Sequence, residues 1–292
     1  MPAGGETVMG SDLLIAHGGK GANQAVAAAR SGGNVTFIAC VGEDDFGEKA
    51  LRKYQDDNIN IEFIKIDQEK PSGVALIIVS EKTGQNSIVV SPGANRSLSV
   101  QDILDHKKTI WDSEIILMQL EIPLEVVALS LKLAKEKEIR TILNPAPAQE
   151  LDDEILQQVD IITPNESETR ILTGIMPDDI HSAEIAAEIL LEKVGMAVII
   201  TMGEAGVYYA TQKGEKGLVE GQKVEVVDTT AAGDVFNGYL AKALVDGKDI
   251  HTAIRIANEA AALSVTRAGA QNSIPAKEEI KLLQLAGKNM KE

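Results

Sequence analysis

Asp234 lies at the start of an apolar helical pattern, directly after the small residues Ala231, Ala232 and Gly233. Small residues let backbone N–H groups approach a ligand closely, and the dipole at a helix N-terminus favours an anion. A carboxylate beside such an anion hole can accept a proton from an attacking hydroxyl during phosphoryl transfer. A helix cap and a tight turn would have the same residues, so this segment alone leaves both interpretations open.

A second glycine-rich segment, 17–24, precedes an alanine-rich helical pattern over 25–30. It lacks the Gly-Lys-Ser/Thr ending of a Walker loop and the third glycine of a dinucleotide fingerprint. Its glycines still permit close backbone approach, while Lys20 and Asn23 add donors suited to sugar hydroxyls. The alternative is a glycine-rich turn that enters a core helix.

Short β-rich runs alternate with longer helical patterns along most of the chain. We predict strands over 36–41, 114–120, 140–144, 161–163, 197–201 and 224–227, and helices over 46–58, 124–137, 155–159, 180–194 and 235–245. This alternation is typical of parallel strands joined by right-handed crossovers. The expected fold is therefore a three-layer α/β/α domain with a mostly parallel central sheet.

Polar residues and turns follow several of these strands. Glu121, Asn144 and Asn165 each come directly after one, and a glycine-bearing turn spans 201–206. Each residue taken singly is typical of a cap or a turn. Ligands in parallel α/β folds bind beyond the carboxyl ends of the strands, so their common position indicates a site there.

One stretch breaks the alternation, because 59–66, 72–79 and 85–91 are three β-like runs without a helix between them. We expect a small antiparallel sheet with a hairpin connection at 81–84. Both faces of the middle run are apolar, so the sheet should cover the active site, another subunit, or simply the core. The chain then divides into an entry segment (1–17), a first core segment (18–58), a β segment (59–95) and a second core segment (96–292).

Composition excludes several classes of function. The chain has 292 residues with Lys+Arg 28 against Asp+Glu 44, and a net charge of −16 argues against nucleic-acid or anionic-membrane binding. It has no long apolar run and no signal-peptide pattern. Cys40 is the single cysteine, which fits a cytoplasmic protein. The four histidines lack metal-ligand spacing, and no serine-nucleophile elbow occurs.

The chain resembles the ribokinase family of sugar kinases along nearly its whole length. The segments that carry the resemblance are 18–25, 144–148, 163–166 and 228–238, and the first and last match the two signatures of the family. The string Gly-Gly-Lys-Gly-Ala-Asn-Gln-Ala together with Asn-Pro-Ala-Pro is typical of the ribose-specific branch. The resemblance implies that ATP phosphorylates O5 of D-ribose, with Asp234 as the base and 231–233 as the anion hole.

The resemblance also implies binding roles for other residues. The sugar would be held by Gly19, Lys20, Gly21, Ala22, Asn23 and Glu121. The nucleotide would be held by Asn165, Thr201, Gly203, Glu204, Ala205, Gly206, Gly233 and Asn258. Mg²⁺ would lie near Glu168. An activating monovalent cation, usually K⁺, would be bound by Asp228, Thr230, Ser264, Arg267, Gly269 and Ser273. In the resemblance, 59–95 would be a β lid with a further lid strand within 1–17, and 96–292 would be the nucleotide-binding core. The β lid would also form the contact of a homodimer.

One departure bears on the sugar. In the family a first core strand ends in Asn-x-Asp, whose carboxylate binds sugar hydroxyls, and here Met1 comes directly before the segment that should follow that strand. A late start site or a shortened chain would account for this. Two alternatives stay open: a sugar- or nucleotide-binding relic without activity, and a kinase for another furanose such as deoxyribose or a nucleoside.

Overall fold

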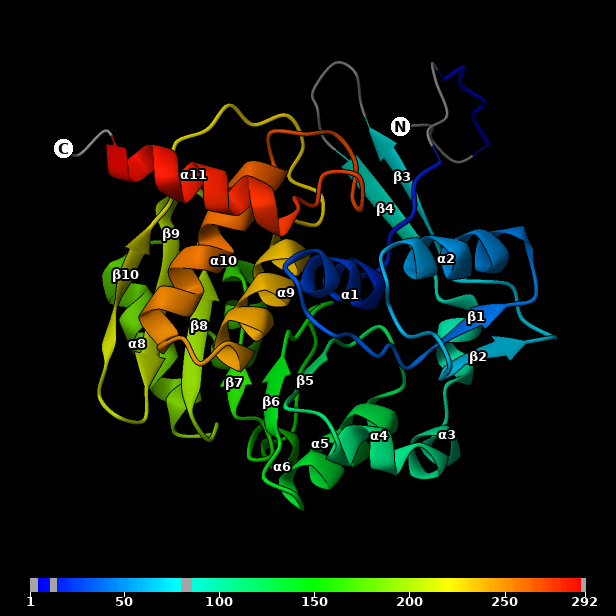
Figure 1. Cartoon of the computed structure of the whole chain (residues 1–292), viewed down its shortest axis with the longest axis horizontal. Helices are drawn as coiled ribbons and strands as arrows, with labels where there is room; N and C mark the ends of the chain where they lie inside the picture. The colour runs from blue at the N-terminus through cyan, green and yellow to red at the C-terminus, as the bar shows by residue number, and fades with distance from the viewer. Residues whose placement is uncertain (1–4, 11–14, 80–85, 290–292) are drawn as a thin grey trace.

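The computed structural model describes residues 5–10, 15–79 and 86–289 (Figure 1). The helices are α1 (Lys20–Arg30), α2 (Asp45–Asp56), α3 (Val100–Asp105), α4 (Lys107–Trp111), α5 (Leu124–Lys135), α6 (Asp153–Leu156), α7 (Glu166–Thr173), α8 (Ile180–Leu191), α9 (Ala232–Val245), α10 (Ile250–Ser264) and α11 (Lys277–Asn289), with 3-10 turns η1 (Gly93–Ser97) and η2 (Gly203–Ala205). The strands are β1 (Ala39–Gly42), β2 (Ile64–Asp67), β3 (Val74–Val79), β4 (Asn86–Ser91), β5 (Ile115–Met118), β6 (Arg140–Leu143), β7 (Ile161–Ile162), β8 (Ala197–Thr201), β9 (Gly206–Thr211) and β10 (Lys216–Glu220).

The central sheet has six strands in the order β10-β9-β8-β7-β6-β5. Strands β5 to β8 are parallel, whereas β9 and β10 run antiparallel as a hairpin at one edge. The prediction of a mostly parallel sheet is confirmed. The carboxyl ends of β5 to β8 consequently meet at one edge, which brings the residues that follow these strands together.

Helices cover both faces of this sheet, because neighbouring residues of each strand point to opposite sides. Ile142 and Ile199 belong to the core cluster that includes α1, α9 and α10. Leu143 and Ile200 belong to the cluster that includes α5 and α8. All four are fully buried, and each such side chain contributes about 1.5–3 kcal/mol through removal of apolar surface from water. The three-layer α/β/α arrangement is therefore confirmed.

Two small sheets lie beside the large one (Figure 1). β3 and β4 form the expected antiparallel hairpin, and its predicted connection at 81–84 lies outside the described residues. β2 does not join this hairpin: it pairs in parallel with β1, with Ala39 opposite Ile64. The expectation that all three runs form one antiparallel sheet is thus wrong, because β2 finds its partner in the preceding βα unit. In the described residues β5 pairs only with β6, so it is an edge strand.

The strand predicted over 224–227 is also wrong. These residues form no strand in the described part of the chain, and Val226 and Val227 are at least half exposed. Valine favours strands only where a neighbouring strand completes the ladder, and here none lies alongside. The N–H groups of Val227 and Asp228 instead donate to the Val265 carbonyl at 2.8 and 3.1 Å, which ties the segment to the loop after α10.

Two helices begin earlier than the sequence pattern predicts. α1 begins at Lys20, so residues 20–24 are helical instead of forming a loop before the helix. α6 spans Asp153–Leu156, earlier than the predicted 155–159. Residues 5–10 and 15–17 contain no strand, while 1–4 and 11–14 lie outside the described residues, so the lid strand within 1–17 stays a prediction. No helix in the described ranges is long and apolar enough to cross a membrane.

Candidate active site

The first turn of α9 presents backbone N–H groups that no described residue accepts from. Ala231 is the N-cap in the left-handed conformation, with φ 64°, and Val235 N–H donates to its carbonyl at 2.9 Å. N–H groups in the first turn of a helix have no earlier carbonyl to reach, so those of Gly233 and Asp234 are available to a ligand. A Cβ added at Gly233 would meet no atom within 4 Å, which shows open space in front of this turn.

Two amide side chains of α1 hold the Asp234 carboxylate. Asn23 Nδ2 donates to Oδ2 at 2.8 Å, and Gln24 Nε2 donates to Oδ1 at 2.9 Å. Asp234 is 8% exposed, so these contacts form away from bulk water. The structure therefore brings the two glycine-rich segments, more than 200 residues apart in the chain, into direct contact.

Opposing influences act on the pKa of Asp234. Burial is the largest and raises the pKa above its usual value, while the hydrogen bonds from Asn23 and Gln24 and the charge of Lys20 lower it in part. Glu121 nearby raises the pKa further. The net result is a carboxylate that is more basic than an exposed aspartate, which suits a group that must accept a proton.

The residues predicted for the sugar surround the same carboxylate. Lys20 N–H donates to Glu121 Oε2 at 2.9 Å, and Gly19 has a φ of 93° that favours glycine. Asn23 Oδ1 is buried without a hydrogen-bond partner in the described residues, so it is a free acceptor for a ligand hydroxyl. Ala22 differs, because its side chain packs in the core and only its backbone could face a ligand.

Gly238 sets the separation of α1 from α9, and the sequence analysis included it in a signature segment without giving it a role. A Cβ at this position would lie 2.5 Å from Ala27 Cβ and 2.7 Å from the Gln24 carbonyl. Only glycine therefore allows the two helices to approach this closely. Gly238 is four residues after Asp234, one turn along the same face, so this approach is what lets Gln24 reach the carboxylate.

Further polar residues beside Asp234 were missed or given no role. Gln24 Nε2 donates also to Asn144 Oδ1, and Gln119 donates to Gln24 Oε1. Thr163 and Asn237 connect the end of β7 to the first turn of α9. Gln24 lies inside the glycine-rich motif, but its role depends on which residues fold against it, and a single sequence does not show this.

The residues predicted for the nucleotide gather around η2. Asn165 forms an isolated bridge with Thr201, and a Cβ at Gly203 would lie 3.5 Å from Glu166 Oε1 at the start of α7. Gly206 has a φ of 104° and lies against the Val219 carbonyl, where a Cβ would be at 2.1 Å. Asn258 Nδ2 donates to the Glu220 carbonyl at 2.9 Å, so α10 reaches the same region from the other side.

Glu168 forms a capping box with Asn165 at the start of α7. Its Oε2 accepts the Asn165 N–H at 2.9 Å, and Asn165 Oδ1 accepts the Glu168 N–H at 2.9 Å. Burial raises the pKa of Glu168, and the charges of Lys20 and Asp234 also act on it. Glu168 thus lies within electrostatic range of the base.

Five of the six residues predicted for a monovalent cation lie in two connected loops, and Ser264 is the last residue of α10. Asp228 Oδ1 accepts the Thr230 N–H and Asp228 Oδ2 accepts the Gly269 N–H, both at 2.9 Å. Burial raises the pKa of Asp228, but these hydrogen bonds outweigh it and leave the pKa below its usual value. Ser264 at the end of α10 and Ser273 in the second loop are both buried, and Arg267 in that loop pairs with Glu279. These loops offer mainly carbonyl and hydroxyl oxygens as ligands. Such oxygens suit a hard cation.

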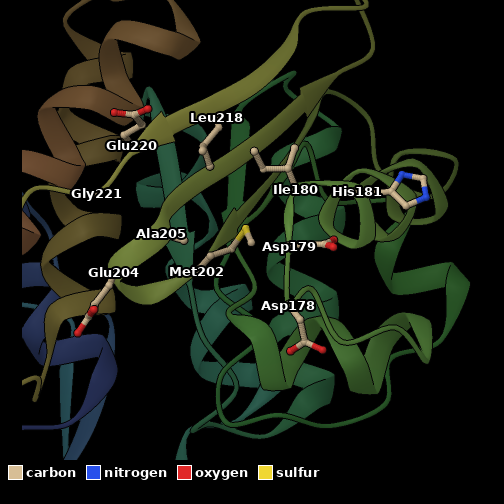
Figure 2. Close-up of a pocket in the computed structure, with 10 residues that line it drawn as sticks. All are labelled: Asp178, Asp179, Ile180, His181, Met202, Glu204, Ala205, Leu218, Glu220 and Gly221. Atoms are coloured by element: carbon tan, nitrogen blue, oxygen red, sulfur yellow. The ribbon is translucent and has the colours of Figure 1, made fainter.

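A cavity of about 620 Å³ lies between η2, β10 and the start of α8. The apolar side chains of Met202, Ile180 and Leu218 lie between Glu220 on one side and Asp178 on the other (Figure 2). Two predicted nucleotide residues, Glu204 and Ala205, line it, but Asp234 does not. The Asp234 carboxylate therefore lies outside this cavity.

Comparison with known proteins identifies the family to which this chain belongs. A family model described as pfkB family carbohydrate kinase matches residues 3–277. A ribokinase of Haemophilus influenzae is 45% identical over 275 residues, which cover 94% of this chain and 89% of that protein. A deoxyribokinase of Salmonella typhi is 38% identical over 280 residues, covering 96% and 91%. Among solved structures, Arabidopsis thaliana ribokinase complexed with ribose and ATP has a TM-score of 0.90 at 28% identity, covering 97% of this chain and 92% of that one.

Proposed function

The chain belongs to the pfkB family of carbohydrate kinases, and we propose that it transfers the γ-phosphoryl group of ATP to O5 of D-ribose, giving D-ribose 5-phosphate and ADP. One observation carries the proposal. Asp234 lies in the first turn of α9 beside available backbone N–H groups, and Asn23 and Gln24 hold its two oxygens. A carboxylate beside available N–H groups supports the proposal, because phosphoryl transfer to a hydroxyl requires a base next to an anion hole.

In the reaction that we propose, the O5–H proton passes to the Asp234 carboxylate. O5 forms a bond to the γ-phosphorus, and the bond from phosphorus to the bridging oxygen breaks, so that its electron pair leaves with ADP. The N–H groups of Gly233 and Asp234 would donate to the transferring phosphoryl oxygens, together with the backbone of Ala231 and Ala232. Preorganised donors of this kind contribute about 3–4 kcal/mol each to transition-state stabilisation.

The sugar would lie between α1 and the end of β5. Glu121 and the unpartnered Asn23 Oδ1 are acceptors for sugar hydroxyls, and the Lys20 side chain is a donor. The glycines at positions 19 and 21 would bring the backbone against the ring. Because Asn23 Nδ2 already contacts Asp234, a hydroxyl bound at Asn23 Oδ1 would lie close to the base.

The nucleotide would lie along the turn 201–206, with Asn165 near the phosphates and Asn258 near the adenosine. Glu168 would lie near a Mg²⁺ ion, which when bound would supply positive charge beside the phosphates. The described residues contain no group of three acidic, histidine or cysteine side chains that could hold a metal ion. Glu168 would therefore act on an ion held largely by phosphate and water, as is common for Mg²⁺.

K⁺ would be held by the loops around Asp228 and Ser273. The Val227 and Asp228 N–H groups already bind the Val265 carbonyl, so the two loops are connected beside the N-terminus of α9. A cation there would order Thr230 and the residues after it, which form the anion hole. In this proposal, a monovalent cation would activate the reaction by ordering the anion hole.

The β3–β4 hairpin would be the lid and the contact of a homodimer. Leu76 and Ile77 point to opposite faces of the hairpin and are 63% and 51% exposed, so both faces present apolar surface. One face could cover the sugar and the other a second subunit. We also propose a cytoplasmic location, where ATP is available and the buried Cys40 stays reduced.

The test is an ADP-release assay of the purified protein with ATP, Mg²⁺, K⁺ and D-ribose. We expect turnover with ribose and a loss of about 10²–10⁴-fold in kcat for Asp234→Asn, with ribose binding retained by calorimetry. Tight ribose or ATP binding without turnover would instead support a kinase relic. A wild-type protein that neither binds nor phosphorylates a pentose would refute the proposal.

A second candidate substrate is 2-deoxy-D-ribose, because deoxyribokinases are among the relatives. The two sugars differ by one hydroxyl. A site that hydrogen-bonds this hydroxyl rejects the sugar that lacks it, since its own polar groups are left unpaired. Ranking ribose, deoxyribose and nucleosides by kcat/KM separates these substrates.

A further inference from the structure

A chain of buried side-chain hydrogen bonds runs from the Asp234 carboxylate back to its own backbone. Gln24 Nε2 donates to Asp234 Oδ1 at 2.9 Å and to Asn144 Oδ1 at 3.0 Å. Asn144 Nδ2 then donates to the Thr163 carbonyl at 3.1 Å. Thr163 Oγ1 donates to Asn237 Oδ1 at 2.7 Å, and Asn237 Nδ2 donates to the Gly233 carbonyl at 2.8 Å.

The donors and acceptors of this circuit can be arranged in only one direction. An ionised carboxylate only accepts, so Gln24 must present its NH₂ group to Asp234. The second N–H of that group points to Asn144 Oδ1, which turns the Asn144 NH₂ group toward Thr163. Gln24 Oε1 in turn accepts from Gln119. A proton on Asp234 Oδ1 would weaken the acceptor that Gln24 needs.

Burial makes the circuit rigid. Gln24, Thr163 and Asn237 are each 1% exposed and Asn144 is 7% exposed. An amide group that lost its partner at such depth would leave an unpaired polar atom away from water. The circuit is therefore stable only as a whole, with every member in its present orientation.

We propose that Gln24 and Asn237 are positioning residues that fix the base and the anion hole relative to each other. Gln24 holds the carboxylate oxygen, and Asn237 holds the Gly233 carbonyl, which belongs to the same peptide unit as the Asp234 N–H. Donation to that carbonyl fixes the peptide plane and polarises its N–H toward a phosphoryl oxygen. The kinetic consequences of this inference rest on the proposed function, whereas its effect on the pKa of the Asp234 carboxylate does not.

The charged groups that face Asp234 come from three elements besides its own. Lys20 on α1 lowers the pKa of Asp234, Glu121 after β5 raises it, and Glu168 on α7 interacts with it electrostatically. None of these charges changes when Gln24 is replaced by an uncharged residue. A change in the titration of Asp234 in such a variant would thus report the lost hydrogen bond.

The first experiment replaces Gln24 with Met, which has a similar length and no amide. We expect kcat to fall about 10-fold to 100-fold through misplacement of the base, with the KM for ribose changed less than about threefold. The acidic limb of kcat/KM should move to higher pH, because a donor to the ionised form is lost. Gln212→Met is the matched control: it removes two amide hydrogen bonds to the Leu191 and Val194 carbonyls, and kcat should not change.

A titration that needs no turnover separates this inference from the proposed function. The ¹³C carboxyl resonance of Asp234, assigned by its absence in Asp234→Asn, is followed against pH. We expect a higher pKa in Gln24→Met than in the wild type and no change in Gln212→Met. An unchanged pKa with unchanged kcat would overturn the role of Gln24, even in an active kinase. A protein inactive on ribose that shows the raised pKa would refute only the proposed function.

The coupling of the two ends is tested by a double-mutant cycle of Gln24→Met with Asn237→Leu. If one circuit joins them, the loss in kcat of the double variant is smaller than the product of the single losses by about threefold or more. Independent positions would give the plain product of the two losses, and this result would refute the coupling.

Discussion

Replacing Gly238 with alanine tests whether the closeness of α1 and α9 holds the base. The added Cβ would lie 2.5 Å from Ala27 Cβ and 2.7 Å from the Gln24 carbonyl oxygen and the Ala28 nitrogen. Non-bonded carbons need about 3.5 Å, so the helices must separate by about 1 Å. Two of the three close atoms belong to the backbone of α1, so a side-chain rotation does not relieve the contact.

That separation acts directly on Asp234. Its hydrogen bonds to Asn23 and Gln24, now 2.8 and 2.9 Å, would lengthen beyond about 3.5 Å and be lost. A displacement of about 1 Å between reacting groups can reduce the rate by about 100-fold. The effect on stability is smaller, because overpacking costs about 1–3 kcal/mol whereas alanine in place of glycine in a helix recovers about 1 kcal/mol.

We therefore expect Gly238→Ala to remain folded, to melt a few degrees below the wild type and to lose about 100-fold in kcat. The measurements are a thermal melt by circular dichroism and the ADP-release assay on the same preparation. Gly217→Ala in β10 is the control, since a Cβ there meets nothing closer than 3.7 Å. A folded Gly238→Ala protein with wild-type kcat would refute the view that helix spacing positions the base.

Three other predictions follow from the same geometry. Burial raises the pKa of Asp234, and the ionised form is the base, so kcat/KM should fall as the pH drops. The midpoint of this acidic limb should lie above the pKa of roughly 3.9 of an exposed aspartate. A midpoint below that value would contradict the assignment of Asp234 as the base. Asp228→Asn should abolish most of the rise in melting temperature that KCl produces over choline chloride, because Asp228 Oδ2 would no longer accept from Gly269; an equal rise in both proteins would place the cation elsewhere. Leu76→Lys should convert a dimer to a monomer in light scattering without loss of fold, since Leu76 is exposed, and a persistent dimer would exclude the lid as its contact.

Some features of the site follow from short stretches of chain. β8 has the bounds predicted from its apolar run, 197–201, because a continuous buried strand is marked by its own residues. Asp234 was placed at a helix start by the small residues before it, and α9 begins at Ala232. Features of this kind depend on local backbone preferences. These preferences are set by residue types within the same short stretch of chain.

Other features depended on contacts between distant segments. The run 224–227 has strand preference but pairs with no strand in the described residues, and Val227 and Asp228 at its end donate to the Val265 carbonyl instead. β2 resembled a lid strand, yet it pairs with β1. A backbone strand is completed only by a partner, and a partner is chosen by the fold as a whole.

From its sequence alone, this protein could be identified as an α/β kinase with a carboxylate beside a small-residue turn. Only the tertiary structure decided how that carboxylate is held. Gln24 reaches it across 210 residues of chain, and Gly238 permits this because a single Cβ would separate the two helices. Residue type and spacing record which groups are present and which backbone shapes they favour. The distances between groups on different helices are set by close packing, which no short stretch of sequence contains.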